Sequence, residues 1–427
     1  MINEKIHKDR LNPHYKLNLN TNAKLRITPL GGLNEIGGNM MVVETENEAI
    51  IVDVGMSFPD GDMHGVDILI PDFTYLREIK DKIVAVIITH GHEDHIGAMP
   101  YLFKEMQFPI YGSPLPLEMI GSKFDEHKMR EHRALFRAIS KRVPIKIGND
   151  FEIEWMHVTH SIIDSSCIAI KTAAGTMIHT GDFKIDHTPY DGFPTDIHRL
   201  AHYGEEGVLV MTSDSTNSHS PGFTKTEKAV GPTFERIFAT ATGRVIMSTF
   251  SSNIHRVAQA IEKALKYGRK ICVIGRSMEK NLDISMTLGY IKFPKDQFIE
   301  AHEINKYTDK EIMIVTTGSQ GESMSALYRM AIHEHRHVKI KPEDQIILSA
   351  KAIPGNEGSV SEIINHLLKA GAKVAYQDFA DIHVSGHAAQ EEQKLMLRLV
   401  KPKFFLPVHG EYNHALKHGE TGVDCGV

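Results

Sequence analysis

The sequence predicts an α/β protein with two domains, and three observations lead to that prediction. A chain of 427 residues is long enough for two domains, or for one domain with a large insertion. Within residues 25–182, several short apolar, β-branched segments end in His or Asp. From about residue 208, strand-like and helix-like patterns alternate, which is typical of a parallel sheet flanked by helices.

The composition is that of a soluble cytoplasmic protein. Hydrophobic residues make up 41% of the chain and charged residues 24%, and no run approaches the roughly 18 uninterrupted apolar residues that a membrane span needs. The three cysteines, Cys167, Cys272 and Cys425, are far apart, which argues against a disulfide framework and favours a reducing compartment. The net charge of -6 does not indicate nucleic-acid binding, so any such binding must depend on a local site.

The chain begins with a polar, mildly basic stretch, residues 1–24, in which no hydrophobic period occurs. We expect a flexible, solubilising arm there rather than a polyanion-binding segment. Strands are then predicted over residues 25–30, 40–43 and 49–53. The glycine-rich residues 31–39 are followed by no helix pattern, which excludes a dinucleotide-binding loop.

Asp53 ends the third of these apolar strands. A carboxylate at a strand end is well placed to orient a metal-binding histidine. It could equally cap a turn, and spacing alone leaves both roles open.

The most informative stretch is His90-Gly91-His92-Glu93-Asp94-His95, which follows an apolar strand predicted over residues 84–88 and precedes a helix predicted over residues 98–103. Three imidazoles and a carboxylate, with no thiolate, suit Zn, Mn or Fe and argue against a closed structural zinc site. The alternative is a solvated, histidine-rich turn.

Two later strands also end in polar residues. The segment 152–160 alternates and ends at His160, and after a strand at 166–171 the segment 175–182 runs into Asp182. Together with Asp53 and His90, four strands end in His or Asp, which predicts one polar site along a rim of a sheet.

The second half of the chain predicts βαβ units. Strand patterns occupy residues 208–211, 244–247, 270–274, 312–315, 345–348 and 373–376, with helix patterns such as 254–267 and 360–368 between them. The loops 214–217, 250–256, 317–322 and 353–357 place small hydroxyl residues or glycine before helices. Such residues are helix N-caps by default, and they also suit an anion. We expect at least one of these loops to hold phosphate.

Histidines return near the end of the chain. Residues 381–388 contain His383 and His387 and lead into a helix, and an apolar strand at 403–408 ends in His409. The last 18 residues are predicted to form a polar, glycine-containing tail.

These motifs resemble the metallo-β-lactamase superfamily, its β-CASP nucleases and, within them, bacterial ribonuclease J, over residues 25–420. The resemblance implies an αββα sandwich with an inserted β-CASP domain, a parallel sheet flanked by helices. It places the sandwich in residues 25–213 and 379–427 and the β-CASP domain in residues 214–378. The return segment 379–427 is then incomplete, and the C-terminal region of family members is expected to be missing.

The resemblance also implies site residues. His90, His92 and His160 would bind one Zn²⁺, Asp94, His95 and His409 a second, and Asp182 would bridge the two, with Mn²⁺ or Mg²⁺ as substitutes. Asp53 matches the family's first aspartate, which orients a ligand. Asp214 and His387 match an active-site pair, in which His387 would protonate the leaving 3′-oxygen; Asp214 could instead only cap the following helix. A 5′-monophosphate would be held by Ser252, Asn253, Arg256, His383, Ser385 and Gly386.

The implied function is a two-zinc ribonuclease that cleaves single-stranded RNA in mRNA decay and in maturation of rRNA and other RNAs. It would act as a 5′-to-3′ exonuclease that prefers 5′-monophosphorylated ends and also as an endonuclease. Family membership further implies a homodimer or homotetramer in the full-length protein, and association with an RNA helicase or ribosomes. The alternatives are a hydrolase of DNA or of a small-molecule ester or lactam, and an RNA-binding scaffold with structural metals.

Overall fold

A computed structural model describes residues 22–59, 63, 65–353, 356–376 and 381–427. The chain forms two compact units. Unit 1 comprises Met1–His187, Phe193–Thr224 and Gly386–Val427, and unit 2 comprises Thr188–Gly192 and Lys225–Ser385. The predicted domain border at residue 378 lies outside the described residues, as do residues 1–21 of the predicted arm.

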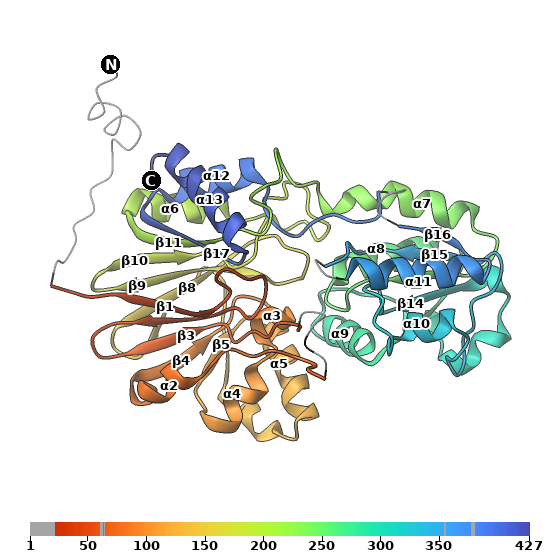
Figure 1. Cartoon of the computed structure of the whole chain (residues 1–427), viewed down its shortest axis with the longest axis horizontal. Helices are drawn as coiled ribbons and strands as arrows, with labels where there is room; N and C mark the ends of the chain where they lie inside the picture. The colour runs from red at the N-terminus through yellow and green to blue at the C-terminus, as the bar shows by residue number, and fades with distance from the viewer. Residues whose placement is uncertain (1–21, 60–62, 64, 354–355, 377–380) are drawn as a thin grey trace, which may run out of the picture. The chain divides into compact units, whose positions relative to one another are not determined.

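Unit 1 contains two six-stranded sheets, shown in Figure 1. The first sheet has the order β1-β2-β3-β4-β5-β6; its β1–β3 strands are antiparallel, and β3–β6 are parallel. The strands are β1 (Arg26–Gly31), β2 (Met40–Glu44), β3 (Ala49–Val52), β4 (Ile83–Ile87), β5 (Ile110–Gly112) and β6 (Phe136–Ala138). As expected, the glycine-rich residues between β1 and β2 form no helix.

The second sheet of unit 1 has the order β17-β11-β10-β9-β8-β7. Neighbouring strands from β7 to β10 are antiparallel, and β10, β11 and β17 run parallel. The strands are β7 (Ile145–Ile147), β8 (Phe151–His157), β9 (Ser166–Thr172), β10 (Gly175–His179), β11 (Val208–Asp214) and β17 (Pro402–Val408).

The two sheets of unit 1 pack face to face. One apolar cluster joins residues of β2, β3 and β4 to residues of β8, β9 and β10, with Trp155 fully buried at its centre. The Trp155 indole N–H donates to the Ile88 carbonyl at 3.0 Å, which ties the second sheet to the end of β4. A buried aromatic ring whose N–H finds an acceptor across the interface fixes how the sheets align.

Helices cover the outer faces of this sandwich (Figure 1). On the second sheet, Leu200 and Tyr203 of α6 and Met396 and Leu397 of α12 pack with the outward residues of β8–β11. The helices and 3₁₀ turns of unit 1 are α2 (Thr74–Glu78), η1 (Lys80–Lys82), α3 (Glu93–Ile96), α4 (Met99–Glu105), α5 (Pro114–Glu126), η2 (Arg130–Leu135), α6 (Ile197–Glu206), α12 (Gln390–Val400) and α13 (Tyr412–Asp424). The αββα prediction is confirmed.

The predicted C-terminal tail is wrong, because residues 412–424 form helix α13. Glycine normally weakens a helix interior, which led to the prediction. Here Gly422 lies directly against Phe405 of β17, and a Cβ at that position would be 2.8 Å from the ring. Burial of His418 and Thr421 against the sheet stabilises the helix, so tertiary packing outweighs intrinsic propensity.

Unit 2 contains the predicted parallel sheet, with five strands in the order β13-β14-β12-β15-β16. The strands are β12 (Val245–Ser248), β13 (Lys270–Ile274), β14 (Ile312–Thr316), β15 (Gln345–Leu348) and β16 (Lys373–Ala375). The helices are α7 (Gly231–Thr240), α8 (Ile254–Lys266), α9 (Arg276–Thr287), α10 (Ala326–Ala331) and α11 (Glu357–Lys369), with 3₁₀ turns η3 (Glu227–Val230), η4 (Lys295–Gln297), η5 (Ala301–Lys306) and η6 (Asp309–Glu311). The helices of unit 2 flank this sheet (Figure 1).

Candidate metal centre

Seven polar side chains that the sequence singled out meet at one end of the unit 1 sandwich. His90 and His92 lie in the loop after β4, and Asp94 and His95 lie in α3. His160, Asp182 and His409 follow β8, β10 and β17. These seven residues form two groups of possible ligand atoms, and within each group all atoms lie within 4.8 Å of one another.

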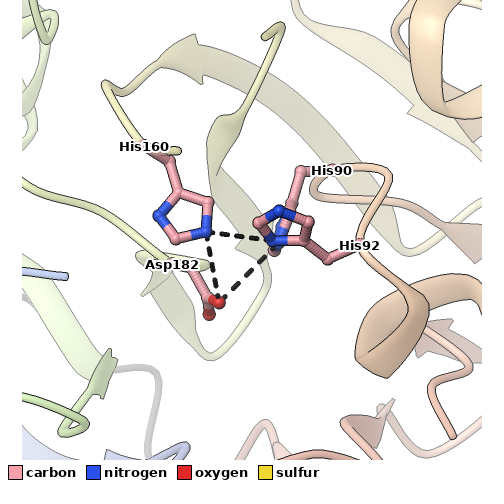
Figure 2. A group of neighbouring side chains, drawn as sticks. All are labelled: His90, His92, His160 and Asp182. Carbon is pink, nitrogen blue, oxygen red and sulfur yellow. Dashed lines mark hydrogen bonds and ion pairs between the residues drawn. The ribbon is translucent and has the colours of Figure 1, made fainter. Parts of the chain in front are cut away.

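The first ligand group consists of His90, His92, His160 and Asp182, which point toward one another in Figure 2. Nδ1 of His92 lies 3.1 Å from Nε2 of His90 and 3.1 Å from Nε2 of His160. Oδ2 of Asp182 lies 3.7 Å from His90 Nε2 and 3.6 Å from His160 Nε2. Three nitrogens and one carboxylate oxygen around a common centre suit a tetrahedral zinc site.

The second ligand group consists of Asp94, His95, His409 and, again, Asp182. Asp182 Oδ1 lies 3.3 Å from His95 Nε2, and Asp182 Oδ2 lies 3.5 Å from His409 Nε2. Oδ2 of Asp94 lies 3.0 Å from His409 Nε2. Because Asp182 belongs to both groups, its carboxylate is placed to bridge two ions.

Hydrogen bonds to Asp53 fix the orientation of His95. The carboxylate accepts from the Thr89 N–H at 2.8 Å, from the Thr89 hydroxyl at 2.7 Å and from His95 Nδ1 at 2.7 Å. A proton held on Nδ1 leaves Nε2 of His95 as the metal-binding atom. Asp53 has a φ of 57°, an uncommon conformation that aspartate tolerates better than most residues. This arrangement supports the ligand-orienting role rather than simple turn capping.

Two other ligand histidines have uncharged hydrogen-bond partners at Nδ1, and His409 Nδ1 also lies 3.6 Å from Asp214 Oδ1. His160 Nδ1 lies 2.7 Å from the Gly386 carbonyl, and His409 Nδ1 lies 2.6 Å from the Thr216 hydroxyl. His409, like Asp53, adopts a positive φ, here 55°. Strained backbone of this kind occurs where surrounding structure fixes a functional side chain.

Helix α3, which carries Asp94 and His95, packs directly on the chain after β3 and on Asn39. Val54 N–H donates to the His95 carbonyl at 2.8 Å, and Asn39 N–H donates to the Asp94 carbonyl at 2.9 Å. A Cβ on Gly55 would lie 1.7 Å from the Asp94 carbonyl oxygen, so only glycine permits this approach.

The carboxylates of the site favour positive charge beside them, and this is visible in the pKa values of the histidines. Burial lowers the pKa of His90 and lowers the pKa of His92 to about 4, so both are neutral ligands near neutral pH. Burial acts in the same direction on His95, but the carboxylates of Asp182 and Asp94 override it and raise its pKa to about 10. The pKa of His409 is also raised, against the effect of burial, chiefly by Asp182. Without metal, the buried carboxylates keep protons on two imidazoles. Divalent ions would neutralise these carboxylates in place of the protons, so the donor set fits a metal centre.

A histidine–aspartate pair adjoins the ligand groups. His387 Nδ1 lies 2.7 Å from Asp214 Oδ2, and the His387 ring lies 4.9 Å from the ring of His160. Asn217 and Thr224 donate to the His387 carbonyl at 2.9 and 2.7 Å, which fixes the backbone. Burial opposes a charge on His387, but Asp214 raises its pKa. Asp214 also accepts from the N–H of Thr216 at 2.9 Å, but residues 216–219 form a turn, so Asp214 caps this turn and not a helix.

Among the predicted phosphate-binding residues, Ser252, Asn253 and Arg256 follow β12 in unit 2. His383 and Ser385 lie in the last segment of unit 2, and Gly386 belongs to unit 1. Ser252 is half-buried, and Asn253 is the buried N-cap residue of α8. His383 and Ser385 are half-buried in the segment before Gly386. Gly386 touches the metal centre, because its carbonyl faces His160.

Arg256 departs from the expectation that it contacts phosphate directly. Its side chain is completely buried and forms a bidentate ion pair with Glu227, at 2.6 and 2.9 Å. Its remaining donors point at other protein atoms of unit 2. A cation at the start of a helix suggested anion binding in the sequence, but the paired Glu227 lies 29 residues earlier and could not be foreseen.

Several residues that form hydrogen bonds with the candidate ligands were not predicted from the sequence. Thr89 directly precedes His90, and its position beside the histidine motif was the only available signal. Thr216 lies in a loop that the sequence marked as a cap or anion site. Asn39, whose amide lies 3.1 Å from His95 Nε2, ends the glycine-rich loop and carried no signal of its own.

Sequence profiles of known families match most of the chain. The family described as "Metallo-beta-lactamase superfamily" matches residues 33–210, and "Ribonuclease J, beta-CASP domain" matches residues 242–367. Residues 371–425 match the "Zn-dependent metallo-hydrolase RNA specificity domain". Fold and profiles together define a metallo-β-lactamase-fold protein with a β-CASP domain, a class whose superfamily implies a divalent metal. No helix among the described residues is both long and apolar enough to cross a membrane.

Individual relatives identify the family to which the chain belongs within this class. A ribonuclease J of Helicobacter pylori is 68% identical over 425 residues, which cover 100% of this chain and 62% of that protein. Ribonuclease J 1 of Streptococcus pyogenes is 46% identical, with coverage of 93% and 70%. The chain belongs to the ribonuclease J family and spans about three fifths of the length of the Helicobacter relative.

A solved structure shows the same fold. The crystal structure of a protein of unknown function from Enterococcus faecalis V583 aligns with a TM-score of 0.65 at 15% sequence identity, covering 92% of this chain and 96% of that one.

Proposed function

We propose that this chain carries the catalytic site of a metal-dependent ribonuclease that removes nucleotides from 5′-monophosphorylated RNA in the 5′-to-3′ direction and also cleaves internally. The observation that carries the proposal is the pair of ligand groups sharing Asp182, with the His387–Asp214 pair beside them. The names of the ribonuclease J relatives and the RNA-specificity profile support RNA as the substrate. The three free cysteines are consistent with a cytoplasmic location. We propose mRNA decay and rRNA maturation as the processes in which the enzyme acts.

The residues proposed to hold the metals are those of the two ligand groups. His90, His92 and His160 would bind one Zn²⁺, Asp94, His95 and His409 the other, and Asp182 would contact both. Two divalent ions so placed supply an activated water and neutralise charge that develops on the phosphoryl group. The imidazoles around them are held by Thr89, Asp53, Gly386 and Thr216, so little reorganisation is needed when RNA binds.

His387 is proposed to protonate the leaving 3′-oxygen. Asp214 accepts a hydrogen bond from its Nδ1, which stabilises the imidazolium and directs Nε2 as the acidic donor. Because Asp214 also contacts Thr216, which orients His409, one carboxylate aligns the proton donor with the second ligand group.

Selection of the 5′-monophosphate is proposed to depend on the start of α8 and on residues 383–385 of unit 2. The buried Asn253 Oδ1 has no hydrogen-bond partner among the described residues, as expected of an amide whose partner belongs to a ligand. Amide oxygen and nitrogen are interchangeable by rotation, so this group could donate to a phosphate oxygen. Hydroxyls of Ser252 and Ser385 would hold a monophosphate, and we propose that the bulkier triphosphate fits poorly.

The test is degradation of three matched RNAs that carry a 5′-monophosphate, 5′-triphosphate or 5′-hydroxyl end. We expect metal-dependent release of mononucleotides from the monophosphorylated RNA, and slower, internal cleavage of the other two. Asp196→Asn, which alters a carboxylate of unit 1 that pairs with Arg142 and lies outside both ligand groups, serves as the matched control for His92→Ala.

Loss of activity in His92→Ala, with Asp196→Asn unchanged, would place the chemistry at the metal centre. Equal turnover of single-stranded DNA of the same sequence would show that the site does not select RNA. Hydrolysis of a β-lactam or thioester by wild type, with every RNA left intact, would overturn the proposal in favour of a small-molecule hydrolase.

A further inference from the structure

Arg256, in the first turn of α8, makes more polar contacts than an ion pair requires. Besides Glu227, its guanidinium donates to the Val384 carbonyl at 3.1 Å and to the Ser349 hydroxyl at 3.3 Å. It also lies 3.5 Å from the Ile382 carbonyl. A planar group with five N–H donors can hold several acceptors in fixed directions, which a lysine ammonium cannot do.

These contacts hold one segment of unit 2, residues 382–384, in place. The Ser349 hydroxyl donates to the Ile382 carbonyl at 2.5 Å, so the segment is bound from two sides. Ser349 itself follows β15, and its N–H donates to the Ser248 carbonyl at the end of β12. Residues 382–384 are therefore held in a fixed position relative to the carboxyl ends of β12 and β15 and the start of α8.

The same guanidinium determines which nitrogen of His383 carries the proton. NH1 of Arg256 lies 3.2 Å from His383 Nδ1. Because an arginine N–H can only donate, Nδ1 must accept, and the ring proton must lie on Nε2. A proton on Nδ1 would place two donors against each other within a partly buried contact.

We infer that Arg256 is a positioning residue for 5′-end selection: it fixes residues 382–384 and holds His383 as the Nε2–H tautomer, so that His383 donates to the 5′-phosphate. The inference rests on the proposed function for its substrate, but the tautomer is a property of the protein alone. Glu227, 2% exposed, neutralises the guanidinium and so removes the attraction that would draw Arg256 onto the phosphate itself.

Arg256→Lys is the direct test, because it retains a cation for Glu227 and removes the fork of donors. Arg244→Lys is the matched control: Arg244 is also buried and bidentate, with Asp344, but it precedes β12 and donates to Lys339 rather than to residues 382–384. If Arg256→Lys does not fold, the double variant Arg256→Met with Glu227→Gln is used as the test variant in its place. This double variant removes both buried charges together.

Two measurements follow. Long-range ¹H–¹⁵N NMR of histidine-labelled protein, assigned with His383→Gln, should show the Nε2–H tautomer in wild type and in Arg244→Lys, and a mixture in Arg256→Lys. Steady-state kinetics on 5′-monophosphorylated RNA should show KM raised roughly ten- to a hundredfold in Arg256→Lys, as expected for a lost hydrogen bond to a charged group, with kcat and 5′-hydroxyl RNA cleavage little changed.

The outcomes separate the inference from the proposed function. Wild type without 5′-monophosphate preference would overturn the proposed 5′-end selection, while the NMR spectrum would still decide the tautomer. An unchanged tautomer, or a folded Arg256→Lys that keeps the wild-type KM on a preferred 5′-monophosphorylated RNA, would overturn the role of Arg256. Equal kinetic effects in Arg256→Lys and Arg244→Lys would show that Arg256 acts only through stability.

Discussion

Replacing Asp53 by Asn should weaken one of the two metal sites without unfolding the protein. The substitution conserves size, and asparagine tolerates the φ of 57° at this position, so the backbone has no reason to move. The carboxylate accepts three hydrogen bonds, from the N–H and hydroxyl of Thr89 and from His95. An amide has one accepting oxygen; if it faces His95, its NH₂ group meets the Thr89 N–H as donor against donor.

The expected loss of metal affinity follows from removing the hydrogen bond that orients His95. Loss of a group that orients a ligand histidine lowers metal affinity by roughly 10- to 100-fold, or about 1.4–2.7 kcal/mol. His95 belongs to the second ligand group, so we expect one of two bound equivalents to weaken and the equivalent bound by His90, His92 and His160 to change less.

The assay is a competition titration of Zn²⁺ against a chromophoric chelator, with Asp196→Asn as the control for loss of a carboxylate. Thermal unfolding in the absence of metal verifies that both variants fold. Two unchanged affinities in Asp53→Asn would refute the orienting role. Equal weakening in Asp196→Asn would show that the effect is one of net charge.

Three further substitutions test other parts of the structure. Gly386→Ala would place a Cβ 2.7 Å from His160 Nδ1, so the purified variant should bind less metal per chain by elemental analysis; full occupancy would contradict this packing. Asp344→Ala leaves a buried guanidinium unpaired and should lower the free energy of unfolding of unit 2 by about 3–5 kcal/mol in denaturant titrations, and a change below 1 kcal/mol would be inconsistent with a buried pair. Burial opposes ionisation of Glu154, but a hydrogen bond from Arg199 lowers its pKa below the usual 4.5, so its stabilising effect is complete above pH 4.5 and is lost as the pH falls further. Glu154→Gln should therefore be less stable than wild type at pH 7 and should lose less stability on acidification, as measured by unfolding at several pH values; parallel curves would contradict this.

The sequence predicted most of the fold because the relevant signals are local. The strand before His90 and the strands ending at Asp53, His160, Asp182 and His409 are short apolar runs bounded by polar residues. Such runs can be recognised in the sequence without knowledge of the elements that pack on them. Helix α13 was missed because its stability comes from burial of His418 and Thr421 against the sheet, which no local pattern reports.

The candidate site was predictable to the same extent. Ligand types concentrate in one motif and at strand ends, so they could be recognised, whereas their supports are ordinary residues such as Thr89. The Arg256–Glu227 pair shows the limit most clearly: the cation was visible in the sequence, but only the fold reveals that its charge is already neutralised.

We propose that Asp182 holds two divalent ions, one in each ligand group. The most direct measurement is anomalous diffraction at the zinc edge from crystals of the protein grown with Zn²⁺. We predict two peaks, one on each side of the Asp182 carboxylate, the first among His90, His92 and His160 and the second among Asp94, His95 and His409. One peak, or peaks that leave Asp182 without a metal contact, would contradict the claim.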